Sequence, residues 1–141
     1  MSEQEREDRI YRMVVRFYEL GGQDPELARV FGAAISDWPD HFRIVADFWS
    51  NALYGTGRYR SHPFPVHMKL DFTPQAFDAW LQAFTQAVGE ILTPLEAQNA
   101  LDRARHMTES FRVGLFPFTL PDGTPSRTPA PPPSASATPK T

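Results

Sequence analysis

The chain has 141 residues, a net charge of −3 and no cysteine. This length suffices for one domain with a hydrophobic core, and the lack of cysteine excludes disulfides, thiolate zinc sites and iron–sulfur clusters while fitting a reducing compartment. Because residues 117–141 carry a charge of +1, the preceding part carries −4. An acidic body argues against nucleic acid as a partner, since binding to phosphates requires a basic face.

The first nine residues are polar and mixed in charge. They lack the basic start and apolar run of a secretory signal, and no stretch of the chain approaches the ~18 apolar residues of a transmembrane helix. We therefore expect a cytoplasmic protein that does not interact with a membrane. Its aromatic content is high, with 11 Phe, 3 Trp and 4 Tyr. Aromatic side chains fill cores, and they also line sites for flat aromatic cofactors.

Apolar residues spaced by three and four predict five helices and no strand. Gly21 and Gly22 end the first helix, Pro25 follows an N-cap in the second, and Thr93 and Glu96 form a capping box at the start of the fifth. The helices are expected at about residues 5–20, from Asp24 through Phe31, from Ser36 or Asp37 to Leu53, from Thr73 to Ile91, and from Thr93 to Leu115.

His67 lies between the third and fourth of these helices, on at most two helical turns. Pro63 and Pro65 precede it and leave the segment few conformations, so the imidazole should have a fixed direction. A neutral imidazole held rigidly between apolar helices is what an axial ligand of haem iron requires. A loop histidine is more often structural, so this interpretation depends on the surrounding residues. His62 and His106 are read as exposed side chains.

The composition changes after the fifth helix. Residues 117–141 contain 8 of the 14 prolines and show no apolar periodicity. This predicts a disordered or polyproline-like tail behind a domain of residues 1–116. A solvated tail without a role is the simpler interpretation, and a docking motif is the alternative.

Several motifs follow one another between residues 10 and 115. They are Phe17-Tyr18, Asp24-Pro25-x-Leu27 with Phe31, Trp38-x-x-His41, Asp47-Phe48-Trp49, Gly55-Thr56-Gly57-Arg58-Tyr59, Pro63 with His67, and Phe77-Asp78-Ala79-Trp80-Leu81. In order and spacing this set resembles the group III truncated haemoglobins. The resemblance implies an all-α fold, the two-over-two helical sandwich of a truncated globin, that binds haem b (iron protoporphyrin IX). The chain departs from the family at Arg60-Ser61-His62, where glycine is common.

The resemblance also implies roles for individual residues. His67 matches the proximal iron ligand, Tyr18, His41 and Trp80 match the polar residues that stabilise the distal ligand, and Phe31 matches a phenylalanine on the haem face. Val45 and Phe48 are expected to make further contacts with the cofactor. Arg58 and Tyr59 are also expected to contact it, as candidate partners of the haem propionates. Arg43 is a further propionate candidate, because guanidinium groups favour carboxylates.

Taken without the resemblance, the same residues have plainer explanations. Tyr18 could be a core tyrosine with a satisfied hydroxyl, Trp80 could pack on its helix face, and His41 could be exposed in the first turn of its helix. Arg43 and Arg58 could equally form surface salt bridges.

We expect a protein that binds O2, NO or CO at one iron site. A hydrogen bond to a ligand that gains negative charge contributes about 1.5–3 kcal/mol. The resemblance suggests NO dioxygenase-like or peroxidase-like chemistry as much as oxygen transport. Three donors favour slow release, which suits chemistry on bound O2 better than delivery. Such chemistry needs an electron donor, which the sequence does not identify, and the chain should be a monomer or weak dimer. The alternative function is a haem-free helical interaction domain whose aromatic groove binds a partner helix. A ligand sensor is a third option, although 141 residues leave little room for an output domain.

Overall fold

The structure is a computed structural model in which residues 2–60 and 73–126 are described. They form five helices and a short hairpin, which are α1 (Glu3–Gly21), α2 (Pro25–Ala34), α3 (Trp38–Tyr54), α5 (Pro74–Ile91), α6 (Pro94–Leu115), β1 (Phe118–Thr119) and β2 (Pro125–Ser126). The predicted helices are all present, and α1 begins two residues earlier than expected because Ser2 caps it. Within the described ranges, no helix combines the length and apolarity needed to cross a membrane.

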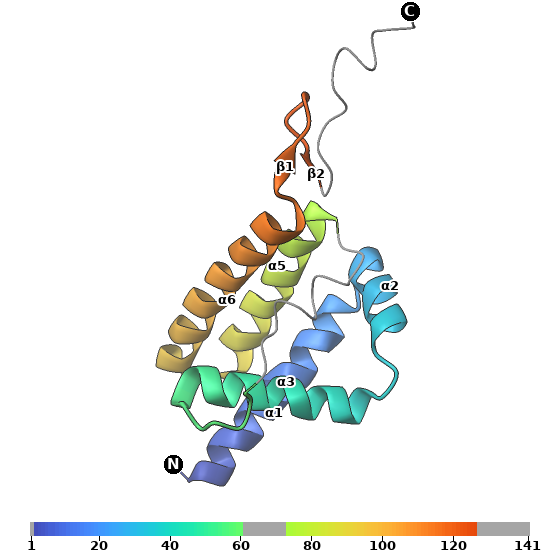
Figure 1. The fold of residues 1–141 in the computed structure, drawn as a ribbon. Helices are drawn as coiled ribbons and strands as arrows, with labels where there is room; N and C mark the ends of the chain where they lie inside the picture. The colour runs from blue at the N-terminus through green and yellow to red at the C-terminus, as the bar shows by residue number, and fades with distance from the viewer. Residues whose placement is uncertain (1, 61–72, 127–141) are drawn as a thin grey trace, which may run out of the picture.

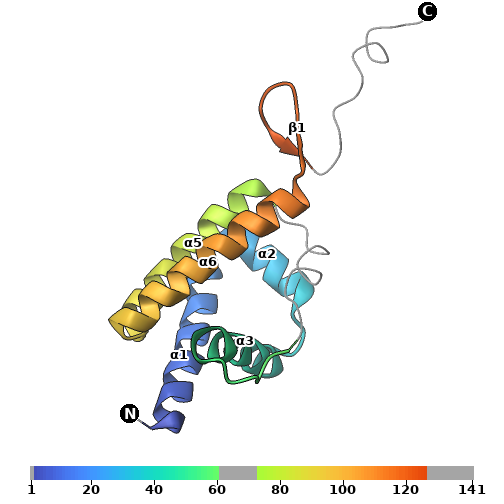
Figure 2. The same cartoon turned by 60° about the vertical axis from the view of Figure 1, so that its left-hand side comes forward.

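The helices form two layers (Figures 1 and 2). α5 and α6 run side by side as one pair, while α1 packs against α5 and is crossed by α3. α3 also reaches α6, and the short α2 contacts α5. The core lies between the layers, where Ile10, Met13, Phe84 and Val88 are almost fully buried. This arrangement confirms the predicted two-over-two sandwich.

Short-range capping explains where most helices begin. The carboxylate of Asp24 accepts the N–H of Leu27 at 3.0 Å, and Asp37 accepts the N–H of Asp40 at 3.1 Å. At the start of α6 the predicted capping box is confirmed, because Thr93 accepts the N–H of Glu96 at 3.3 Å and Glu96 accepts the N–H of Thr93 at 3.0 Å. Each cap satisfies backbone donors that a helix leaves unpaired in its first turn.

Thr73 precedes α5 as predicted, but its side chain does not cap the helix. Its hydroxyl donates to Oε1 of Glu26 at 2.7 Å, and its backbone N–H donates to Oε2 of the same carboxylate at 2.8 Å. Glu26 therefore fastens the start of α5 to α2 across the fold.

The hairpin after α6 was not predicted. β1 and β2 pair antiparallel, with Phe118 opposite Ser126, and the N–H of Leu120 donates to the carbonyl of Thr124 at 2.8 Å. The structure thus differs from the predicted tail at residues 118–126, which form this hairpin, while residues 127–141 lie outside the described part. The overlooked signal is Pro121-Asp122-Gly123, a turn sequence in which Gly123 takes a φ of 89°.

A buried ion pair joins the first and last helices. Arg9 donates from Nε to Oε1 of Glu96 at 2.8 Å and from Nη2 to Oε2 at 2.6 Å. The hydroxyl of Tyr54, at the end of α3, also donates to this carboxylate, and the Arg6 guanidinium lies 4.6 Å from the Tyr54 ring centroid. Three helices therefore meet at one carboxylate.

Burial by itself would raise the pKa of Glu96. Hydrogen bonds from Arg9, Tyr54 and the backbone of Thr93 act in the opposite direction and outweigh it, so the pKa falls to about 2. Glu96 is 4% exposed and stays ionised at neutral pH. Its charge then stabilises the folded state, because the unfolded chain offers no comparable partners.

We expect Glu96→Gln to lower the free energy of unfolding by about 3–5 kcal/mol at pH 7, since it leaves the Arg9 guanidinium buried without a countercharge. The measurement is urea denaturation. The matched control is Glu90→Gln, which removes an exposed pair with Arg16 at 2.8 Å and should leave the free energy of unfolding nearly unchanged, because solvent screens an exposed pair.

The same comparison has a pH dependence. The folded-state pKa of Glu96 is depressed, so its contribution is complete above the ordinary carboxyl pKa and is lost as the pH falls towards about 2. The difference in the free energy of unfolding between wild type and Glu96→Gln should therefore shrink from about pH 5 downwards. A difference in free energy that stays constant as the pH falls would contradict the lowered pKa of Glu96.

Candidate functional site

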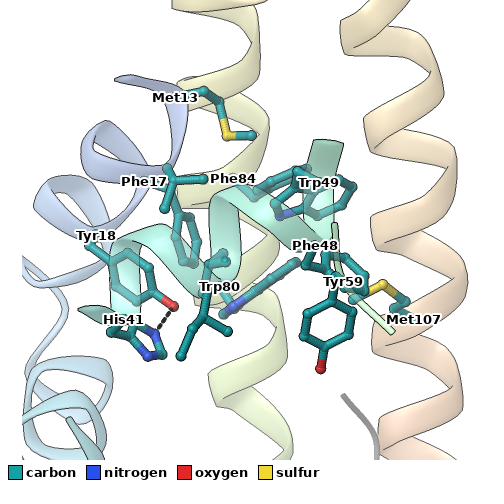
Figure 3. A pocket seen from close by; sticks show the side chains of 13 residues that line it. Met13, Phe17, Tyr18, His41, Phe48, Trp49, Tyr59, Trp80, Phe84 and Met107 are labelled. Atoms are coloured by element: carbon teal, nitrogen blue, oxygen red, sulfur yellow. Dashed lines mark hydrogen bonds between the residues drawn. The ribbon is translucent and has the colours of Figure 1, made fainter. Parts of the chain in front are cut away.

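A cavity of about 360 Å³ lies between α1, α3, α5 and α6 (Figure 3). Its size falls within the range of roughly 300–1,000 Å³ that is usual for small-molecule and cofactor sites. Apolar and aromatic side chains dominate the lining, and polar atoms come from a few side chains, among them Tyr18, His41 and Tyr59. Apolar walls with a few polar groups are typical of a site that binds an organic ligand.

Helical periodicity explains how side chains of α1 and α3 come to line the cavity. On α1, Met13 and Phe17 stand one turn apart and face inward. On α3, His41, Val45 and Phe48 follow one another at intervals of four and three. Ile44, on the same helix, lines the cavity and is also 39% exposed, so the cavity borders the protein surface at this point.

Stacked rings form the inner wall. Phe84 lies between Trp49 and Trp80, with ring centroids 4.7 Å and 5.2 Å apart and interplanar angles of 25° and 12°. Phe17 packs edge-on against Trp80 at 5.1 Å. Such a stack has few alternative rotamers, and it presents a rigid apolar surface to whatever occupies the cavity.

A polar pair occupies one side of the cavity. The hydroxyl of Tyr18 lies 2.7 Å from Nε2 of His41, and Figure 3 shows both side chains opposite Tyr59 and Met107. Burial raises the pKa of the Tyr18 phenol, so the hydroxyl keeps its proton at neutral pH. The hydroxyl donates to Nε2 in one imidazole tautomer and accepts from it in the other. The pair can therefore offer either a proton or a lone pair to a ligand.

Most of the predicted site residues meet at this cavity. Its lining includes six of them, namely Tyr18, His41, Val45, Phe48, Tyr59 and Trp80. Phe31 is instead buried beside Tyr18, with ring centroids 5.0 Å apart, and Arg58 pairs with Glu3 at 3.2 Å. His67 and His62 fall in residues 61–72, outside the described residues.

Two other residues that the sequence singled out lie at the surface. Arg43 pairs with Asp40 at 2.6 Å and Asp47 at 3.4 Å. His106 is exposed on α6, as predicted.

Several lining residues were not predicted as site residues. They are Met13, Val14, Phe17, Ile44, Trp49, Phe84 and Met107. Most of them belong to apolar helical stripes that the sequence assigns to the core. Periodicity marks the inward face of a helix, but it does not show which part of that face adjoins a cavity.

Comparison with known proteins identifies the class. The bacterial-like globin family matches residues 6–114, and the chain belongs to that family. The group 3 truncated hemoglobin ctb of Campylobacter jejuni is 26% identical over 117 residues, which cover 79% of this chain and 92% of that protein.

A solved structure agrees with this result. The crystal structure of a group III truncated hemoglobin from Campylobacter jejuni matches with a TM-score of 0.69 and 28% identity, covering 74% of this chain and 87% of that one. The resemblance to group III truncated haemoglobins is thus confirmed, and the globin family implies a haem cofactor. None of these matches supports the alternative of a haem-free interaction domain.

The buried phenol of Tyr18 can be tested directly. We expect Tyr18→Phe to leave the rise in absorbance at 295 nm between about pH 9 and 11 unchanged, because a phenol with a raised pKa does not ionise in this range. In urea, where burial is lost, the same substitution should remove one tyrosine's share of the signal. A reduced signal in the folded protein would show that Tyr18 is accessible.

Proposed function

We propose that this protein binds haem b in the cavity and binds a diatomic gas, O2, NO or CO, at the iron. When bound, haem supplies a metal site for reversible gas coordination. The observation that carries the proposal is the Tyr18–His41 pair, which lies at 2.7 Å at one side of an aromatic cavity in a bacterial-like globin. The cavity suits a porphyrin because its walls are ring faces and aliphatic groups, while its polar atoms are confined to a few side chains.

His67 is the residue proposed to hold the haem iron. Support comes from the resemblance, from its place in the motif order and from the two prolines that precede it. The imidazole would bind in its neutral form, which is the form that prevails near neutral pH for an ordinary histidine.

Tyr18, His41 and Trp80 are proposed to stabilise the gas ligand. Trp80 lines the cavity, and its indole N–H can donate but not accept. Tyr18 and His41 exchange one hydrogen bond, so a ligand can recruit either of them as a donor. One such bond to a charged acceptor contributes about 1.5–3 kcal/mol, which corresponds to roughly ten- to a hundredfold in affinity.

Tyr59 is the favoured partner for the haem propionates on the described side of the cavity. It lines the cavity, and its ring packs edge-on against Phe48 at 5.2 Å. Arg58 is a weaker candidate than the sequence suggested, because its guanidinium is engaged by Glu3 at 3.2 Å and by Glu7 at 3.7 Å.

Slow gas release favours chemistry over transport, so we propose NO dioxygenase-like or peroxidase-like activity. In peroxide chemistry, the Tyr18–His41 pair would take up and return a proton at the imidazole. A reductant would supply the electrons that this chemistry consumes. We further propose that the protein acts in the cytoplasm as a monomer or weak dimer, without nucleic acid or membrane as a partner.

Replacement of the proposed axial ligand tests haem binding. We expect the protein reconstituted with haemin to show a Soret band that His67→Ala abolishes or strongly alters, since the iron loses its protein ligand. His106→Ala, which removes an exposed histidine of α6, is the control and should leave the band unchanged. An unaltered spectrum for His67→Ala would remove His67 as the ligand.

The rate of O2 release tests the distal residues. Tyr18→Phe and Trp80→Phe should each accelerate release by roughly ten- to a hundredfold, because each removes a donor to the ligand. Stopped-flow absorbance measures the rate, and Tyr11→Phe at a 40% exposed tyrosine serves as the control. Changes below about threefold for both variants would exclude the proposed roles, because they are far smaller than a lost hydrogen bond predicts.

A further inference from the structure

The segment from Gly55 to Arg60 follows α3 without forming helix or strand. Gly55 and Gly57, with φ of 63° and 74°, turn the chain. Tyr59 then reaches the cavity lining. Since no backbone ladder fixes this segment, the side chains that bond to it determine where Tyr59 lies.

A chain of hydrogen bonds connects this segment to α1. The N–H of Arg58 donates to the hydroxyl of Thr56 at 3.4 Å, and the hydroxyls of Thr56 and Ser50 lie 2.9 Å apart. Ser50, which is fully buried on α3, donates to Oε2 of Glu7 at 3.0 Å. A serine hydroxyl has one proton, and it is directed to Glu7, so Thr56 must donate to Ser50. The bonds therefore all run in one direction and end on a carboxylate.

The carboxylate of Glu7 is the fixed acceptor at the end of this series of hydrogen bonds. Its carboxylate pairs with Arg6 at 2.9 Å and lies 3.7 Å from Nε of Arg58, so cations flank it on both sides. A charged acceptor polarises the hydroxyls that lead to it and strengthens each bond in turn. A separate bond at 2.8 Å, from the N–H of Gly57 to the side chain of Asn51, holds the middle of the segment.

We propose that Glu7, Ser50 and Thr56, here called the Glu7 relay, position Tyr59 at the edge of the cofactor. This proposal rests on the proposed haem site. None of the three residues is among the cavity-lining residues of the described structure, so they act through Tyr59 and are positioning residues. A partly buried series of polar groups contributes little net stability compared with apolar packing, whereas its directional bonds select one arrangement of the segment.

The decisive variants are Thr56→Val, which keeps the shape but loses the hydroxyl, and Thr56→Ser, which keeps the hydroxyl. We expect Thr56→Val to release haemin to excess apomyoglobin about tenfold faster than wild type, which corresponds to roughly 1.4 kcal/mol. Thr56→Ser should release it at the wild-type rate, and Glu7→Gln should be intermediate because an amide oxygen still accepts. Thr85→Val is the control for the side-chain change, since Thr85 is exposed on α5 and its hydroxyl donates to the carbonyl of Leu81 in the same helix.

A second readout does not depend on haem. With 3-fluorotyrosine installed at position 59, the fluorine resonance of the haem-free protein should shift or broaden in Thr56→Val and return to its wild-type position in Thr56→Ser. Urea denaturation then separates positioning from stability. A Thr56→Val variant that lowers only the denaturation midpoint, with the resonance and the haemin release rate unchanged, would overturn the proposal.

The two proposals can fail separately. If wild-type protein takes up no haemin, the proposed function fails and the cofactor part of this inference fails with it. The fluorine resonance still decides whether the relay positions Tyr59. If wild type binds haemin but Thr56→Val behaves as wild type in both readouts, the relay is wrong and the haem site stands.

Discussion

The bidentate bond between Arg9 and Glu96 connects the two layers of this globin, and much of the remaining geometry follows from it. It fastens the middle of α1 to the start of α6, and Tyr54 adds the end of α3 to the same carboxylate. Two residues closer to the N-terminus, Glu7 holds the segment after α3 through Ser50. The first helix therefore sets the separation of the helices that enclose the cavity, in addition to contributing one of its walls.

The cavity combines a rigid interior with a polar edge. The stack of Trp49, Phe84 and Trp80 leaves little freedom to the inner wall, while Tyr18 and His41 exchange a hydrogen bond at the border. An apolar surrounding strengthens that hydrogen bond, because the local dielectric constant is low. It also keeps the phenol protonated. The same burial thus preserves the proton that a ligand could use.

Sequence patterns within one helical turn predicted where the helices lie. Contacts between residues far apart in the sequence could not be predicted, for a physical reason. Asp24 and the Thr93–Glu96 box act within one helical turn, so their spacing is visible in the sequence. Arg9 and Glu96 are 87 residues apart, and Ser50 and Glu7 are 43 apart, so no periodicity connects them. The aromatic stripes predicted a core, but only the resemblance singled out Tyr18, His41 and Trp80. The hairpin was overlooked because the proline content of the tail concealed the turn at Gly123.

The carboxylate of Glu26 has a consequence beyond its own helix, at the start of α5. It holds Thr73 by two hydrogen bonds, at 2.7 Å and 2.8 Å, while Thr56 and Asn51 hold the chain just before residue 60. A carboxylate on α1 and one on α2 thus each hold a residue of another segment, Thr56 through Ser50 in the first case and Thr73 in the second. Acidic residues near the start of the chain therefore fix backbone positions far along it, which no contact within α1 or α2 could do.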